Sequence, residues 1–280
     1  MKSSIIFFEK RLLQVYTVFG IDTSDIPQTM AEHDVYPFAR QCAGNRVYPL
    51  SIAQRYQSGE IICDDAADPK SVLFWHCCGF AYLSGEITEA FLQTVYKEYM
   101  RKERERRFVL ITDDSEAIRF FSEKEDVTLD QRIEYRYNAP GAQVPDACSL
   151  AIERISAGNI ARITGRIVPS FSWTSPEQFL NNGFGYVAVD GGRVAAVAFS
   201  AAVSSDEVDI GVETTSEYRR QGLASVLAER MCREIVSMGK RPVWAHAISN
   251  VGSMRTAERV GFTPDRVNTV IRKRADLKNA

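Results

Sequence analysis

The chain has 280 residues, 45% of them hydrophobic and 25% charged, with a formal net charge of −2. This length allows two domains of ordinary size or one large one, and the composition is typical of a globular protein. The small net charge gives no overall attraction to nucleic acid or to an anionic membrane. No apolar run is long enough to span a bilayer, and the apolar residues 5–8 are too short for a signal peptide, so we expect a cytoplasmic protein.

The six cysteines and three histidines are scattered, and no Cys-x-x-Cys pair occurs. The spacing therefore predicts no metal site, and reduced, mostly buried thiols are expected instead. The cysteines are Cys42, Cys63, Cys77, Cys78, Cys148 and Cys232.

In the first half of the chain, helices are predicted to alternate with strands. Apolar spacing predicts a helix over residues 5–20, and a weaker pattern follows to about residue 68. The further predicted elements are short helices at 49–56 and 116–122, a longer helix at 87–100, and strands at 71–79, 108–112 and 132–137. We therefore expect an N-terminal α/β domain over residues 1–138. The basic run 101–107 includes Glu103 and Glu105, which favours a solvated helix end over a nucleic-acid site.

The clearest domain boundary is segment 139–146, which holds two prolines and a glycine. A second domain is predicted over residues 147–280. Its first elements are a strand at 148–155, helices at 159–167 and 175–181, and two strands at 184–189 and 194–202 that form a hairpin around Asp190-Gly191-Gly192. Ser175 or Thr174 would cap the second of these helices.

After the hairpin comes a strand, a polar turn and a long helix. Val208, Ile210 and Val212 alternate with polar residues and glycine, which indicates a strand, and apolar residues recur at helical spacing after Gly222. A glycine before the first free N–H groups of a helix is suited to binding an anion. Two arginines in the same turn favour phosphate as that anion.

The turn sequence Arg-x-x-Gly-x-Ala, residues 219–224, resembles the acetyl-CoA pyrophosphate loop of the GNAT superfamily of N-acetyltransferases. A strand at 242–247 and a short helix at 250–261 follow, with Asn-x-x-Ser at its start and Gly-Phe at its end, and these resemble the family's second cofactor-binding segment. The resemblance covers roughly residues 148–275. It implies an α+β fold with a mixed, mostly antiparallel central sheet flanked by helices. The first half is a candidate for a degenerate copy of the same fold.

The resemblance also implies acetyl-CoA as the co-substrate. Its expected contacts come from the strand, the turn and the second helix: Val212, Thr214, Arg219, Arg220, Gln221, Gly222, Leu223, Ala224, Ser225, Asn250 and Ser253. Asn250 is equally suited to capping its helix.

Acetyl transfer requires a neutral amine, whereas a primary amine with a pKa of about 10 arrives protonated. Glu213 is the first candidate to take the proton, because it lies on the motif strand. Asp209 and Glu207 follow on the same strand face, which could equally be the solvated side of a sheet. Many relatives carry a tyrosine acid where this chain has Ala257. His246 could serve instead, although a structural histidine is the other interpretation.

The sequence therefore predicts an acetyl-CoA-dependent N-acetyltransferase that acts on a primary amine of a small molecule, by direct attack in a ternary complex. Residues 173–185 and 210–214 resemble the two-domain branch related to the zwittermicin A resistance acetyltransferase. The alternatives are a protein acetyltransferase acting on lysine or an N-terminus, and a non-catalytic acyl-CoA-binding sensor. A monomer or homodimer is expected.

Overall fold

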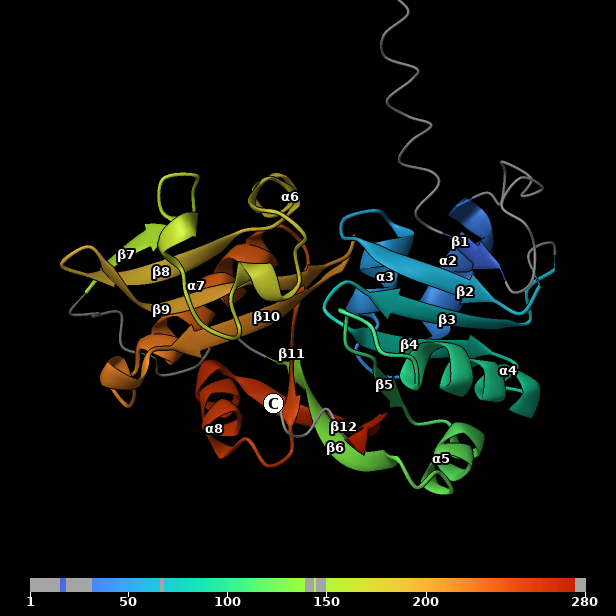
Figure 1. Cartoon of the computed structure of the whole chain (residues 1–280). Coiled ribbons are helices and arrows are strands. Elements are labelled where there is room, and N and C mark those ends of the chain that lie inside the picture. The colour runs from blue at the N-terminus through green and yellow to red at the C-terminus, as the bar shows by residue number, and fades with distance from the viewer. Residues whose placement is uncertain (1–15, 19–31, 66–67, 139–143, 145–149, 275–280) are drawn as a thin grey trace, which may run out of the picture. The chain divides into compact units, whose positions relative to one another are not determined.

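The computed structural model describes residues 16–18, 32–65, 68–138, 144 and 150–274 (Figure 1). The chain divides into two compact units, one of residues 1–129 with 270–280 and one of residues 130–269. Each unit is described by itself. The expected boundary at 139–146 lies, apart from Val144, outside the described residues, so the domain limits 1–138 and 147–280 stay a prediction.

The first unit contains a sheet with the strand order β1-β2-β3-β4-β5, beside which the end of β12 is added. Its strands are β1 (Tyr16–Val18), β2 (Gly59–Cys63), β3 (Ser71–His76), β4 (Phe80–Gly85) and β5 (Val109–Thr112). Its helices are α2 (Glu32–Gln41), α3 (Val47–Ala53), α4 (Glu89–Thr94), the π-helix η1 (Val95–Met100) and α5 (Ser115–Ser122). β3 is buried along its whole length, as expected of the apolar run at 71–79.

Several predictions for this half were wrong or incomplete. The described part of the predicted helix 5–20 is strand β1, which pairs in parallel with β2. Strands β2 and β4 and helix α2 were not predicted. The first five residues of β4 are all buried. A fully buried strand lacks the alternation by which a strand is recognised, so periodicity did not reveal it.

The second unit has the strand order β6-β11-β10-β9-β8-β7, with β12 on the other side of β6. Its strands are β6 (Val127–Tyr137), β7 (Ala151–Arg154), β8 (Gly185–Asp190), β9 (Arg193–Val203), β10 (Glu207–Thr214), β11 (Arg241–Ala247) and β12 (Phe262–Lys273). Its helical segments are η2 (Ile160–Arg162), η3 (Pro169–Phe171), α6 (Pro176–Asn182), η4 (Ser216–Tyr218), α7 (Leu223–Ser237) and α8 (Val251–Val260). The pairing is antiparallel except between β10 and β11, so the expected mixed, mostly antiparallel sheet is confirmed.

The predicted hairpin forms between β8 and β9, and Ser175 caps α6 by accepting a hydrogen bond from the N–H of Gln178. The predicted helix 159–167 is wrong, because only the short turn η2 forms there. The amide of Asn159 accepts from the N–H of Ser156 at 2.8 Å and donates to the carbonyl of Arg154 at 3.0 Å. Such local side-chain bonds to the backbone compete with a helix.

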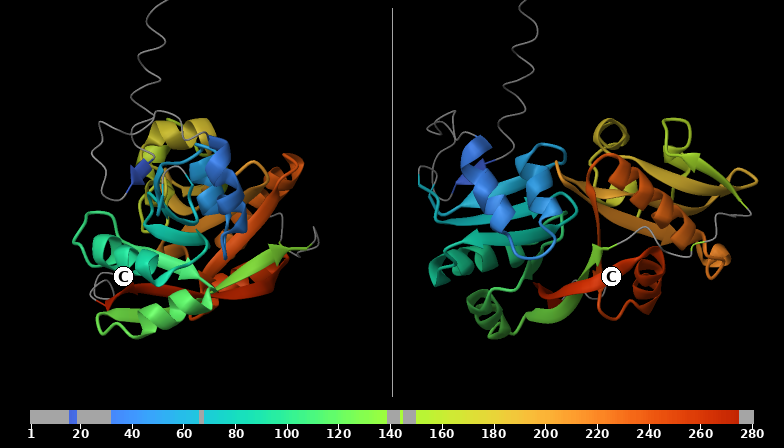
Figure 2. Two further views of the ribbon diagram at one scale, coloured as in Figure 1. Left: turned by 90° about the vertical axis from the view of Figure 1, so that its right-hand side faces the viewer. Right: turned by 180° about the vertical axis from the view of Figure 1, so that it is seen from behind.

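Helices lie on both faces of the strands β8–β10 (Figures 1 and 2). On one face, Leu223, Leu227, Met231 and Ile235 of α7 are buried at helical spacing. On the other, Phe179 of α6 packs edge-on against Phe199 of β9, with ring centroids 6.3 Å apart. The five described cysteines are free, and all but Cys77 are buried, as expected; Cys148 lies outside the described residues.

The two units share one succession of elements. In the first unit, β2, β3 and β4 are followed by α4, β5, α5 and β6; in the second, β8, β9 and β10 are followed by α7, β11, α8 and β12. In both, the third strand pairs in parallel with the strand after the helix. The last strand of each succession extends into the other unit, because the unit limits fall within β6 and β12. This correspondence supports the interpretation of the first half as a degenerate copy.

Candidate acyltransferase site

Strands β10 and β11 separate partway along their length. Their parallel ladder joins Glu207–Asp209 to Arg241–Val243. In the part of the chain that the structure describes, no pairing joins them beyond these residues, and β11 continues on its other side against β6. We call Ile210–Thr214 and Trp244–Ala247 the splayed segment. Here the backbone groups of β10 that face β11 are not used by the sheet.

An irregularity in the neighbouring strand coincides with the start of the splayed segment. On β9, Ala202 faces Asp209 and Ser200 faces Ile210, so that Ala201 is an extra residue. A bulge of this kind bends the strand pair and increases its twist. The bulge therefore accounts for the departure of β10 from β11 after Asp209.

The turn after β10 leads to a helix start that no side chain caps. Gly222, the N-cap of α7, has φ +83°, in the left-handed region that favours glycine. A Cβ at this position would meet no protein atom within 4 Å. The N–H groups of Ser225 and Val226 bond to the carbonyl of Gly222, whereas those of Leu223 and Ala224 have no acceptor among the described residues. Ser225, which was predicted to offer its N–H to the cofactor, already uses it inside the helix.

Most side chains of the turn are held by the protein itself. Arg219 donates from Nε to the carbonyl of Thr214 at 3.3 Å, and Tyr218 donates to a carboxylate oxygen of Asp190 at 2.7 Å. The amide of Gln221 donates to the carbonyl of Glu217 at 3.4 Å. Arg220 is exposed, its backbone also has positive φ, and its guanidinium forms no hydrogen bond or ion pair with a described residue. Arg220 is thus the arginine that remains available to an anion at the start of α7.

The second predicted cofactor segment is built around the cap of α8. Asn250 accepts the N–H of Ser253 at its side-chain oxygen, 3.1 Å away, and Trp244 donates from Nε1 to the hydroxyl of Ser253 at 3.0 Å. Gly261 ends the helix with φ +100°, as expected from the Gly-Phe signal. Asn250 therefore has the capping role that was its alternative interpretation, and cofactor contact by Asn250 or Ser253 stays a prediction.

The three acids of β10 are not a solvated sheet face. Asp209 and Glu207 are buried, and Glu207 forms an ion pair with Arg241 at 2.6 Å. Glu213 is half-buried, and its Oε2 accepts the N–H of Ile167 at 3.2 Å. Glu213 thereby holds the segment between η2 and η3 against the splayed strand.

His246 lies on the opposite face of the sheet from Asp209 and Glu213. Asp209 pairs with Val243, and the alternation along β11 turns His246 to the other side. Its ring stacks on Tyr135 with centroids 5.1 Å apart, and its Nδ1 lies 2.8 Å from the carbonyl of Ala247. Burial lowers the pKa of His246, so the neutral ring donates from Nδ1. The structure does not bring His246 together with the predicted acids.

Two residues that the sequence did not single out, the acid Glu134 and the amide Asn268, lie in the same part of the sheet as Asp209. Glu134 of β6 faces Ala245 of β11, which places its side chain on the same sheet face as Asp209. Glu134 is 6% exposed, and the amide of Asn268 in β12 donates to its Oε1 at 2.8 Å. Alternation in the predicted strand 132–137 already marked Glu134 as polar, but only the pairing of β6 with β11 shows its neighbours.

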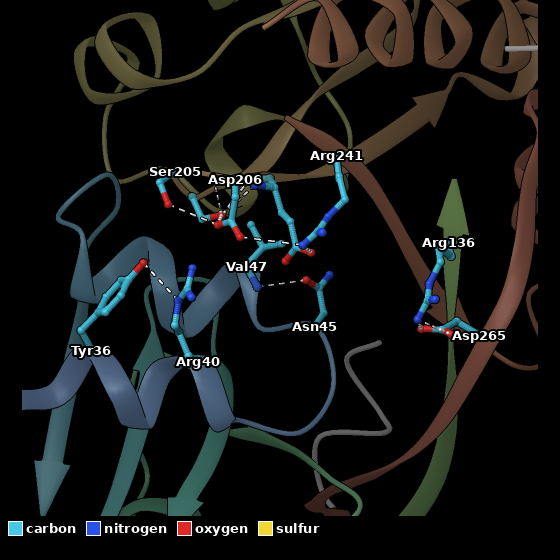
Figure 3. A network of polar contacts seen from close by, with 11 residues as sticks. Tyr36, Arg40, Asn45, Val47, Arg136, Ser205, Asp206, Arg241 and Asp265 are labelled. Carbon is cyan, nitrogen blue, oxygen red and sulfur yellow. Dashed lines mark hydrogen bonds and ion pairs between the residues drawn. The ribbon is translucent and has the colours of Figure 1, made fainter. Parts of the chain in front are cut away.

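Burial raises the pKa of Glu134 to about 7. The charges of Asp209 and Asp265 raise this pKa further, while Arg132 and Arg266 oppose the shift. Asp265 is itself paired with Arg136 at 2.9 Å, and Figure 3 shows these two side chains turned toward each other from β12 and β6. The same figure shows Arg241 directed at Asp206, near the paired start of β10.

Strand β10 leaves its parallel neighbour and leads into a helix start that no side chain caps. The free backbone groups of such a strand can pair with an extended ligand, and the free N–H groups of the helix can bind the phosphates of that ligand. The chain matches the sequence model described as GNAT acetyltransferase over residues 46–270, and it therefore belongs to the GNAT acetyltransferase family. It is an acyltransferase. The match includes most of the described part of the first unit, well beyond the 148–275 on which the sequence resemblance rested.

Individual relatives agree with this assignment. The uncharacterized N-acetyltransferase YdfB of Bacillus subtilis is 25% identical over 227 residues, which cover 77% of this chain and 85% of that protein. A GCN5-related N-acetyltransferase-like protein from Streptococcus suis superposes with a TM-score of 0.69 at 19% identity, over 87% of this chain and 98% of that one. A GCN5-related N-acetyltransferase from Kribbella flavida gives 0.55 at 16% identity, over 81% and 94%. At these identities the two structures show a shared fold, and the narrower two-domain branch stays a prediction.

None of the helices in the described ranges combines the length and the apolar character that crossing a membrane requires.

Proposed function

We propose that the protein transfers the acetyl group of acetyl-CoA to a primary amine of a small molecule, by direct attack of the amine in a ternary complex. The observation that carries this proposal is the splayed segment of β10 leading into the uncapped start of α7. Membership of the GNAT acetyltransferase family supports it. The absence of cysteine from β10 and the turn favours direct attack over an acetyl-cysteine intermediate.

The donors at the start of α7 fit a pyrophosphate. The N–H groups of Leu223 and Ala224 would bind it with the positive end of the helix, and Arg220 would add a charge. Gly222 leaves open space where a side chain would meet the ligand. The backbone of Val212–Thr214 would pair with the pantetheine amides, as an added strand pairs with a sheet edge. Acetyl-CoA supplies an activated acyl group at the end of this track.

The acids of β10 would act on the amine. Glu213 and Asp209 lie on one face of the splayed strand, where their carboxylates would attract the ammonium form of the acceptor and orient it. Glu213 keeps its Oε1 available, because only Oε2 is bonded to the N–H of Ile167 among the described contacts.

The first experiment measures thiol release from acetyl-CoA with a panel of small amines and a lysine peptide, together with calorimetric binding of CoA. Release that depends on a small amine is expected. Release with the peptide alone would favour protein acetylation. Binding of CoA without any release would favour the sensor, an outcome compatible with the buried Ala257 at the usual tyrosine position.

A pair of glycine substitutions tests the placement of the cofactor. Gly222 and Gly239, at opposite ends of α7, have φ of +83° and +73°, and neither has a protein atom near the place of a Cβ. Alanine at either position costs about 1–2 kcal/mol of stability through the left-handed backbone. We expect Gly222→Ala to weaken CoA binding about tenfold or more, and Gly239→Ala to leave it unchanged. Equal CoA affinities in the two variants would show that the α7 start is not the phosphate site.

A further inference from the structure

We propose that Glu134, held by Asn268 beside Asp209, is the group that receives the proton of the acceptor amine. The inference rests on the proposed acetyl transfer and adds a catalytic residue to it. Glu213, which lies within the splayed segment and on the same face of β10 as Asp209, then orients the acceptor.

The sheet register places this group where the strands separate. Asp209 is the last residue of β10 that pairs with β11, and its partner there is Val243. Ala245 is the next residue of β11 on the same face, and Glu134 faces it from β6. Because Ala245 carries only a methyl group, it does not stand between the Glu134 carboxylate and β10. Glu134 and Asp209 thus border the splayed segment from two strands.

Asn268 gives an independent indication that a donor belongs here. Its side chain is 1% exposed, and its nitrogen is the donor to Glu134. Its Oδ1 is buried and has no hydrogen-bond partner among the described residues. A buried acceptor without a partner is costly, so it indicates a missing donor. An ammonium group offers three N–H donors, enough for Glu134, Asp209 and the Asn268 oxygen together.

The electrostatics suit a proton acceptor. Glu134 forms no ion pair within the described part of the chain, whereas the neighbouring Glu207 and Asp265 each have an arginine. Desolvation and the charge of Asp209 hold the pKa of Glu134 at about 7, against the opposing charges of Arg132 and Arg266. A general base is most effective when its pKa lies near the working pH. An acid bonded only to neutral groups and facing another acid meets that condition.

The step balances without any further reactant. The ammonium form of the acceptor gives one proton to the Glu134 carboxylate and becomes a neutral amine. The nitrogen lone pair forms the new N–C bond, the thioester C–S bond breaks, and the second nitrogen proton leaves with the thiolate as a free thiol. Glu134 then returns its proton to water.

The test compares Glu134→Gln with Glu213→Gln in the full-length chain, using the small amine that supports thiol release. Glutamine keeps the shape of Glu134 and can still bond to Asn268. We expect wild type and Glu213→Gln to share a rise in kcat/KM with a midpoint near pH 7. In Glu134→Gln that rise should be absent, with kcat about 100-fold lower at neutral pH and the KM for acetyl-CoA unchanged. A rise that persists in Glu134→Gln, or a rate within about threefold of wild type, would overturn the proposal.

A second measurement does not depend on turnover. In protein labelled with ¹³C at the glutamate carboxyls, one resonance should titrate near pH 7 and be missing from Glu134→Gln. Ethylammonium chloride should lower that midpoint, and sodium chloride at equal ionic strength should not. If no amine supports release but ethylammonium still shifts the midpoint, the acetyl-transfer proposal fails while the amine site stands. If ethylammonium has no effect, the assignment of Glu134 is wrong.

Discussion

Glu134 also makes the stability of the fold depend on pH. The carboxyl ionises near pH 4.5 when unperturbed and near pH 7 in the folded chain, where burial raises its pKa. Between these values the folded state holds the extra proton, so the free energy of unfolding falls as the pH rises through this window. A separation of about 2.5 pH units at about 1.4 kcal/mol each gives a loss of about 3 kcal/mol by pH 8.

Urea unfolding at half-unit pH steps from 4 to 8 measures this loss, with wild type and Glu134→Gln compared at each step. Subtracting the two curves removes the contributions of groups that do not interact with Glu134, which leaves its own titration and its coupling to charged neighbours such as Asp209. The variant should be about 3 kcal/mol more stable relative to wild type at pH 8 than at pH 4. Parallel curves would refute the reasoning, because they would mean that Glu134 ionises alike in the folded and unfolded chain.

Three other substitutions separate structural from functional roles. His246→Leu should lower the free energy of unfolding by about 1–2 kcal/mol, because the hydrogen bond to the Ala247 carbonyl is lost. Its kcat should stay within about threefold of wild type, and a larger loss would indicate that His246 is a catalytic acid. Asn250→Ala should cost about 1 kcal/mol of stability in urea unfolding, the usual value of an N-cap. Arg220→Gln should leave stability within about 0.5 kcal/mol and weaken CoA binding, with a smaller salt dependence in calorimetry; unchanged affinity would contradict the phosphate contact.

The part of the site that lies close together in the sequence could be predicted from it. The alternation before Gly222 and the helical spacing after it identified β10 and α7, and the Asn-x-x-Ser and Gly-Phe signals identified α8. Each depends on contacts between residues a few positions apart. The family match confirms the superfamily that these motifs indicated.

The acid group around Asp209 could not be found in the same way. Glu134 and Asn268 are 134 residues apart in the sequence, and neither belongs to a motif. Their meeting depends on β6 pairing with β11 and lying next to β12, which no local pattern encodes. The failed helix at 159–167 has a local cause instead, since Asn159 bonds to nearby backbone groups in preference to a helical turn.

Because the unit limits fall within β6 and β12, cutting the chain between the two halves would separate strands that belong to one sheet. A cut within 139–146 would give one fragment that keeps β6, which pairs with β11, and another that keeps β12, whose end lies beside β5. Each fragment would lack a strand that its own sheet needs and would expose an unpaired sheet edge. The halves are therefore expected to aggregate when made separately and to complement each other when made in the same cell, so that the polypeptide can be split but neither half can be dispensed with.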